Sequence, residues 1–103
     1  MSKQAVLNVL YPKEAASDFD MDYYLHKHMP LVQKLWAPFG LKSWSVATTG
    51  EESGFYLQAV LIFESPEALE KMPTDEVFGD VKNFTSITPQ KWVGSLQAQV
   101  TVN

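Results

Sequence analysis

Apolar residues recur along the chain with two periods, and these periods divide the sequence into strands and helices. Runs rich in β-branched, aromatic or alternating apolar residues predict strands at 4–11, 41–48, 55–64 and 92–102. Between the first two strands, a helical spacing of apolar residues runs from Met21 to about Trp36. Shorter helices are expected after Ser65 and after Thr74 or Asp75.

The long helix has clear start and stop signals. Asp20 is expected to cap its first turn, because the carboxylate can accept from free backbone N–H groups, and Gly40 follows its end. Pro30 lies inside the helical pattern and cannot donate to the carbonyl of His26. We therefore expect a kink or break near Met29.

The order strand, helix, strand, strand, helices, strand is that of a split βαβ arrangement. It predicts an α+β, ferredoxin-like fold, in which helices cover one face of a four-stranded antiparallel sheet. The 103 residues suit a single domain spanning 1–103.

The strand at 55–64 is apolar on both faces, which has a consequence for assembly. Helices would cover one face only and would leave Tyr56, Val60 and Ile62 on the other. A second copy of the chain is the simplest cover for this face. We therefore expect a homodimer in which two sheets close into an α/β barrel.

The two histidines are expected to face opposite ways. At about 100° per residue, His28 falls in the apolar arc with Met21, Tyr24, Leu25, Val32 and Leu35, whereas His26 lies near the polar side. Their i, i+2 spacing prevents them from sharing one metal ion. His28 is thus the candidate catalytic residue, as a general acid/base or a polar anchor for a ligand, and a buried histidine satisfied within the protein is the alternative.

Other polar and aromatic residues are candidate ligand-binding residues. Asn8 and Gln58 lie within central strands, where they could pair with each other or contact a ligand. Tyr24, Trp44 and Tyr56 could shape a pocket or simply pack in the core, and helical phase does not decide between these two roles.

Composition excludes several function classes. The net charge is −4 and no two Lys or Arg residues are adjacent, so neither nucleic acid nor an anionic membrane is an expected partner. No cysteine, glycine-rich nucleotide loop or metal-ligand cluster is present in the sequence, and we expect no metal and no cofactor. The first ten residues lack the pattern of a signal peptide, which predicts a cytoplasmic protein.

The segment around His28 resembles the helix motif of the EthD family, named for ethyl tert-butyl ether degradation. An acidic residue and aromatics precede His28-Met29-Pro30-Leu31, and the later Gly40-Leu41 with Trp44 is similar to the family's second strand. The order of elements matches the family over essentially the whole chain. This resemblance implies a dimeric α/β barrel with a cleft between helix and sheet, in which His28 is the polar residue.

The resemblance also implies a function class. It suggests a protein that binds a small apolar organic molecule and acts, as enzyme or accessory, in oxidative degradation of the ether-breakdown type. A non-catalytic dimer that binds a ligand or shields an intermediate is one alternative. Related dimeric barrels include cofactor-free monooxygenases, isomerases and cyclases, and fold analogy does not choose among oxidoreductase, isomerase and lyase chemistry. A third possibility is a pure dimerisation or stress protein.

Overall fold

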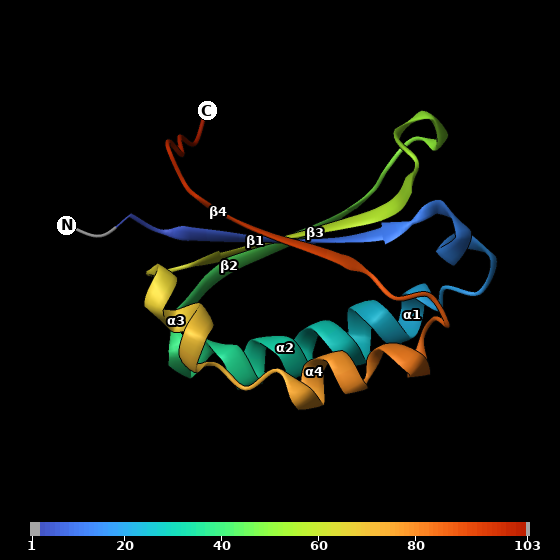
Figure 1. Cartoon of the computed structure of the whole chain (residues 1–103), viewed down its shortest axis with the longest axis horizontal. Coiled ribbons are helices and arrows are strands. Elements are labelled where there is room, and N and C mark those ends of the chain that lie inside the picture. Colours follow the sequence, from blue (N-terminus) through green and yellow to red (C-terminus); the bar gives the residue numbers. More distant parts are fainter. Residues whose placement is uncertain (1–2, 103) are drawn as a thin grey trace.

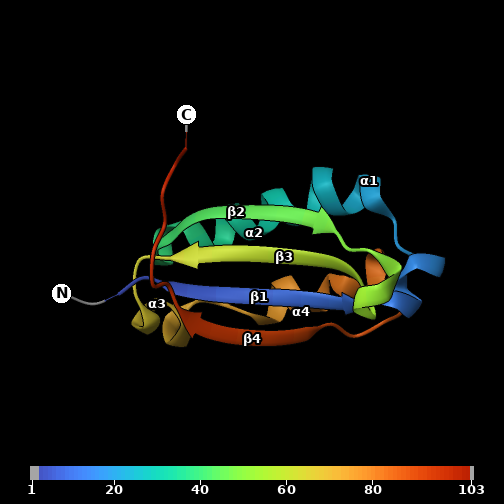
Figure 2. The ribbon, with the colours of Figure 1, turned by 90° about the horizontal axis from the view of Figure 1, so that it is seen from above.

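The computed structural model describes residues 3–102, which form one antiparallel sheet with helices on one side. The sheet consists of β1 (Ala5–Pro12), β2 (Leu41–Thr48), β3 (Phe55–Phe63) and β4 (Gln90–Ser95) in the order β2-β3-β1-β4 (Figures 1 and 2). This order is that of the ferredoxin-like split βαβ fold, and the predicted fold class is confirmed.

Helices occupy the two crossover connections. The first contains α1 (Met21–Tyr23), a π-helical turn η2 (Tyr24–His28) and α2 (Met29–Trp36), and the second contains α3 (Pro66–Lys71) and α4 (Asp75–Gly79). Short 3₁₀ turns lie at η1 (Lys13–Ser17), η3 (Ala37–Phe39), η4 (Glu51–Ser53) and η5 (Val81–Asn83). In Figure 1 the labelled helices α1 to α4 all lie on the same side of the sheet. None of the helices within residues 3–102 is long and apolar enough to cross a bilayer.

Strand periodicity places the core between the sheet and these helices. Every second residue of β1 and β3 is buried toward the helices, and the antiparallel register sets Leu7 opposite Leu61 and Val9 opposite Ala59. The long helix contributes its own buried face from Tyr24, Met29, Val32 and Trp36.

The segment near Pro30 stays helical, and where a kink or break is expected a wide turn directly before Met29 is the irregularity. Asp20 caps the helix as expected, accepting from the Tyr23 N–H at 3.1 Å. In η2 the Met29 N–H bonds to the Tyr24 carbonyl, five residues earlier. A π turn contains one extra residue, which rotates the following side chains relative to a regular helix. Met29 and Trp36 therefore enter the core, whereas Leu25, predicted to face inward, is 37% exposed.

The last strand is shorter than predicted. β4 pairs with β1 from Gln90 to Ser95, so it begins two residues earlier than the predicted 92–102 strand. Residues 97–102 are not in a strand, because the hydrogen bonds to β1 end with the Leu96 N–H, which donates to the Gln4 carbonyl at 2.8 Å.

The sheet face away from the helices is open in the single chain. We call it the open face. Val6, Leu10, Val60 and Ile62 lie on it, half-buried, as the alternation predicts. Tyr56 was expected to join them. Instead it packs against Phe19, with 5.3 Å between ring centroids, at the end of β3 where the register with β1 becomes irregular.

Candidate functional site

His28 lies at the end of the π turn and points into the domain, as helical phase predicts. The residue is 4% exposed. Its imidazole stacks on the Tyr24 ring, with 5.3 Å between centroids and 16° between planes, and the Phe84 ring lies 4.6 Å away at a tilt. His26, two residues earlier, is exposed. The two histidines thus occupy opposite environments.

A carboxylate from the second crossover holds the His28 ring. Asp80, which follows α4, has Oδ2 3.0 Å from His28 Nδ1. Its other oxygen, Oδ1, accepts from the Tyr23 hydroxyl at 2.7 Å and from the Asn83 amide at 2.8 Å. Both carboxylate oxygens are therefore fixed, and the imidazole orientation is fixed with them.

A second set of hydrogen bonds joins the segment before the helix to the segment that covers the site. Asp18 accepts from the Thr85 hydroxyl at 2.6 Å and from the Ser86 N–H at 2.9 Å. The Asp20 N–H donates to the Phe84 carbonyl at 2.9 Å. These bonds position Phe84 over Tyr24 and His28.

The protonation of this pair is set mainly by burial. Burial lowers the pKa of His28, and the neighbouring Asp80 carboxylate offsets this only in part. Burial raises the pKa of Asp80, but hydrogen bonds from Tyr23, Asn83 and His28 outweigh it and leave the pKa below its usual value. At neutral pH we therefore infer a neutral imidazole whose Nδ1–H donates to an ionised Asp80, which leaves Nε2 as a basic nitrogen.

The imidazole borders a small apolar cavity between the long helix and the sheet. Its volume is about 20 Å³, which is room for about one water molecule. Its walls come from the long helix, from β1 and β3, and from α4: Val9, Tyr11, Tyr24, His28, Met29, Val32, Trp36, Ala59, Leu61, Val77 and Phe78.

Two phenols share this cavity with His28. Burial raises the pKa of Tyr11 and that of Tyr24 far above the ordinary value, so both hydroxyls keep their protons. Within residues 3–102 neither hydroxyl takes part in a side-chain hydrogen bond, and neither does Nε2 of His28. The cavity is thus lined by two side chains with a hydroxyl that can donate, Tyr11 and Tyr24, and by one with a basic nitrogen, His28.

The structure brings together only some of the predicted site residues. Tyr24 shares the cavity with His28. Asn8 and Gln58 lie on the open face and bond to each other at 3.3 Å, on the opposite side of the sheet from His28. The Trp44 indole N–H donates to Gln33 at 3.0 Å, away from the cavity.

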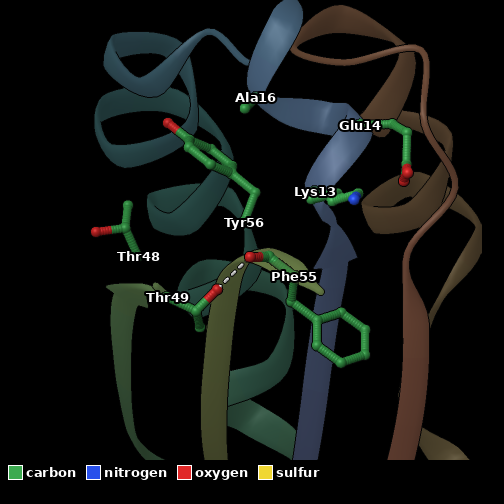
Figure 3. Close-up of a pocket in the computed structure, with 7 residues that line it drawn as sticks. All are labelled: Lys13, Glu14, Ala16, Thr48, Thr49, Phe55 and Tyr56. Carbon is green, nitrogen blue, oxygen red and sulfur yellow. Dashed lines mark hydrogen bonds between the residues drawn. The ribbon is translucent and has the colours of Figure 1, made fainter. Parts of the chain in front are cut away.

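Tyr56 lines a larger and more open groove at the end of the sheet. This groove has a volume of about 700 Å³ and lies between η1 and the ends of β2 and β3 (Figure 3). Its lining residues are Lys13, Glu14, Ala16, Thr48, Thr49, Phe55 and Tyr56. Figure 3 shows the Tyr56 ring extending from β3 toward Ala16. Tyr56 therefore does not belong to the His28 cavity.

Sequence reasoning missed Asp80, Tyr11 and Phe84 as partners of His28. Asp80 lies 52 residues from His28 in the chain, and no local pattern connects the two. Tyr11 could have been found, because strand alternation places it on the same face as Leu7 and Val9. Within residues 3–102, no group of three or more His, Asp or Glu side chains is placed to hold a metal ion.

Comparison with known proteins adds information on the fold. A scan against protein-family models and a search of curated proteins both find no match. Among solved structures, an EthD-like protein from Ralstonia eutropha JMP134 superposes with a TM-score of 0.81 and 24% identity, covering 98% of each chain. An ethyl tert-butyl ether degradation (EthD) family protein from Bacillus halodurans C-125 gives a TM-score of 0.65 and 23% identity, over 92% of this chain and 99% of that one.

A third solved structure is more distant in sequence. It is a proposed monooxygenase from Shewanella loihica PV-4, with a TM-score of 0.58 and 16% identity over 96% of this chain and 99% of that one. The resemblance that the sequence motif indicates is confirmed at the level of the fold. The chain has the fold of the EthD-like proteins over essentially its whole length.

Proposed function

We propose that the protein binds a small, largely apolar organic molecule beside His28, and that His28 transfers a proton to or from it. The observation that supports this proposal most directly is the His28–Asp80 pair at an apolar cavity, with Nδ1 of the imidazole 3.0 Å from a carboxylate. A carboxylate at Nδ1 fixes the tautomer in which Nε2 is the proton acceptor.

The proton transfer requires no group beyond those in the chain and the ligand. Nε2 takes a proton from an acidic C–H or O–H bond of the ligand, and the electron pair of that bond stays on the ligand as an anion. The imidazolium that forms is stabilised by the Asp80 carboxylate. The Tyr11 and Tyr24 hydroxyls, which stay protonated, are the available donors to the new anion.

The size of the cavity sets a condition on this proposal. Pockets for organic ligands usually have volumes of about 300–1,000 Å³, far more than the space beside His28. The cover over His28 consists of α4, η5 and Phe84, and the two short helices bury only Val77 and Val81. We propose that α4, which buries only Val77, moves outward when the ligand enters, whereas hydrogen bonds keep Asp80 and Phe84 in place.

The reaction class follows from analogy alone. The solved structures that share the fold include EthD-like proteins and a proposed monooxygenase, so oxidative degradation of an organic compound is the activity we propose to test first. Isomerase and lyase chemistry would use the same proton transfer.

We further propose that the open face packs against a second copy of the chain. Val6, Leu10, Val60 and Ile62 are half-buried there, and Trp92 of the edge strand β4 is 62% exposed. Full burial of an exposed apolar side chain contributes roughly 1.5–3 kcal/mol, and covering these half-buried ones contributes proportionally less. The Asn8–Gln58 pair would satisfy its own hydrogen bond within such an interface.

A second candidate function is a purely structural role for His28. The tight packing of the residue, 4% exposed beside a cavity of about 20 Å³, favours this alternative. In that case the protein would be a non-catalytic dimer that binds or shields a ligand elsewhere. The groove lined by Tyr56, with a volume of about 700 Å³, is large enough for such a ligand.

The test follows the His28 ring during ligand titration. Ring resonances of the wild type would be recorded by NMR against 4-nitrophenol and ethyl tert-butyl ether, with His28→Gln and with His26→Gln as the matched control. We expect the His28 signals to shift on binding, and both compounds to bind the wild type and His26→Gln more tightly than His28→Gln. Equal binding by all three proteins would support the structural role instead.

The variant Asp80→Asn tests the carboxylate separately. Loss of the negative charge should lower the pKa of His28 further, because the carboxylate now raises it. The amide should also donate to Nδ1 and move the imidazole proton to Nε2, which ¹⁵N NMR detects directly. An unchanged tautomer and pKa in Asp80→Asn would contradict the assigned role of the pair.

A further inference from the structure

The helix layer does not cover the edge strand β4 on its helix-facing side. The register with β1 sets Val93 opposite Leu7 and Lys91 two residues before Val93, so both side chains point toward the helix layer. Yet Val93 is 62% exposed and Lys91 is exposed as well. Figure 2 shows β4 as the outermost strand next to β1, with α4 on the far side of the sheet. The domain is therefore open between α4 and β4.

Phe78 of α4 lies between this opening and the cavity beside His28. Phe78 lines that cavity. It also lines a second space of about 120 Å³, which we call the outer hollow, together with Val81, Thr88, Pro89 and Lys91. Because α4 is the element proposed above to move outward, Phe78 is the side chain that such a movement would displace from between the two spaces.

Lys91 contacts Phe78 through an interaction that an anion can replace. The Lys91 Nζ lies 4.0 Å from the centroid of the Phe78 ring, a position in which the ring attracts the ammonium group. Among the described side chains, Lys91 forms neither a hydrogen bond nor a salt bridge. A carboxylate carries a full charge and accepts hydrogen bonds, so it attracts an ammonium group more strongly than a ring does. An anionic ligand would therefore take Lys91 from Phe78 and free the ring to move.

The charges around the outer hollow favour such an anion. Lys91 is the one charged residue that lines it. An adjoining space of about 360 Å³ also borders Phe78 and Thr88, and its one charged lining residue is Lys82. The chain as a whole has a net charge of −4, but the described residues around these two spaces supply two ammonium groups and no carboxylate. The other lining residues of the outer hollow, Thr88 excepted, are apolar.

We infer that the outer hollow is the entrance to the His28 cavity, and that Lys91 selects ligands with one carboxylate on a small apolar body. The inference rests on the function proposed above and deepens it, because it names the class of ligand and the residue that recognises it. Lys91 binds the carboxylate outside the Phe78 ring, while the apolar part of the ligand passes the displaced ring toward His28.

Benzoate and benzamide test this selection, because they have nearly the same shape and differ in charge. By isothermal titration calorimetry at low ionic strength, we expect the wild type to bind benzoate about three- to tenfold more tightly than benzamide. Lys91→Met should abolish this preference, whereas Lys91→Arg should retain it. Lys42→Met is the matched control, because Lys42 is an exposed lysine on β2, and it should bind both compounds as the wild type does.

NMR of the Lys91 side chain follows the exchange of partners independently of affinity. In the free protein the Phe78 ring current should move the Lys91 Cε proton signals to lower frequency. We expect saturating benzoate to return these signals toward their ordinary position and to shift the His28 ring signals in the same titration. Phe78→Leu should give the ordinary Lys91 position without any ligand.

The outcomes separate this inference from the proposed function. The inference would be overturned by an equal preference for benzoate in the wild type and Lys91→Met, by Lys91 signals that keep their ring shift at saturation, or by His28 signals that stay unchanged. Wild-type protein that binds no benzoate at millimolar concentration would overturn it as well. A preference lost in Lys91→Met, with His28 signals that shift and equally tight binding by His28→Gln, would support the inference and contradict the proposed role of His28.

Discussion

At the scale of residues, the protonation of His28 couples the site to the stability of the fold. Its pKa is lower in the folded chain than in the unfolded chain, because burial disfavours the imidazolium. The unfolded state therefore binds more protons between the folded pKa and about 6.5, and the free energy of unfolding rises with pH in that window. Asp80 acts in the same direction at lower pH, because its pKa is also lower in the folded chain: its stabilisation is present above the ordinary carboxyl pKa and is lost as the pH falls through the folded value.

We therefore expect two separate losses of stability on acidification. Between pH 7 and 5 the wild type should lose stability through His28, at no more than about 1.4 kcal/mol per pH unit, and the loss through Asp80 should follow below pH 4. Thermal melts across this range would measure both. His28→Gln should remove the first loss and keep the second.

His26→Gln is the control for this experiment, because His26 is exposed and has no partner among the described residues. It should reproduce the wild-type profile. If His28→Gln showed the same slope as the wild type between pH 7 and 5, the pH dependence would have to be assigned to another group.

For individual residues, the sequence predicts only part of the site. Helical phase correctly indicates that His28 points inward, because the apolar arc is a local property of the helix. Its partner Asp80 comes from the second crossover, and only the tertiary packing of two helical segments brings the two together. Asn8 and Gln58 were predicted to pair or to contact a ligand, and their pairing is confirmed.

At the scale of elements, Gly40 connects the long helix to β2 under two constraints. Its φ of 109° lies in the left-handed region, and an added Cβ would approach Glu64 Cβ at 3.2 Å and Ala68 Cβ at 3.5 Å. Its carbonyl also accepts from the Glu64 N–H at 2.8 Å, which fixes the turn against the end of β3. Glycine is favoured here for both conformation and space.

Two other glycines allow the constraints on Gly40 to be separated. Gly54 has a φ of 82° but no atom near an added Cβ, and Gly50 has neither constraint. We expect Gly54→Ala to lower the free energy of unfolding by about 1–2 kcal/mol through backbone strain, Gly40→Ala to lower it by more, and Gly50→Ala to leave it almost unchanged. Urea unfolding of the three variants would check this order. Equal effects of Gly40→Ala and Gly54→Ala would mean that the close contact with Glu64 costs nothing.

Strands were easier to predict than the helix. The alternation in 41–48 predicts β2 with its observed bounds, because one strand face packs on the core. Pro30 correctly signals an irregularity, but apolar spacing does not encode which hydrogen bonds replace the missing one. The π turn, and with it the entry of Met29 and Trp36 into the core, therefore could not be predicted.

At the scale of the whole molecule, the open face is where assembly can be tested. Ile62 lies on this face in the central strand β3, next to the last residue of that strand, and a lysine there would bring a charge into the proposed interface. We expect Ile62→Lys to raise the dissociation constant of the dimer by at least about tenfold while the single chain stays folded, since a charge buried without a partner is costly. Analytical ultracentrifugation and circular dichroism would measure the two properties.

Glu67→Lys places a lysine on α3 instead, on the helix-covered side of the sheet. It should leave the association of the chains unchanged. An Ile62→Lys protein that dimerises as tightly as the wild type would place the interface on another surface.

The fold of the whole molecule was predictable because each strand and helix carries its own local signal and few topologies fit their order. The end of the last strand was not, because 96–102 has the period of a strand while the ladder to β1 ends at Leu96. Local periodicity shows that a segment suits a strand, whereas its partner can lie outside the chain.

The π turn at Tyr24–His28 has a consequence for how this helix can vary in length. Removal of one residue from the exposed stretch His26–Lys27 would convert the wide turn into an ordinary one and keep the segment helical. Because the ordinary turn covers the same rotation with one residue fewer, His28 and everything from Met29 onward would keep their present facing. A single codon deletion there would thus be tolerated by both tasks of the helix, since the packing against the sheet and the approach of the histidine to Asp80 could survive together.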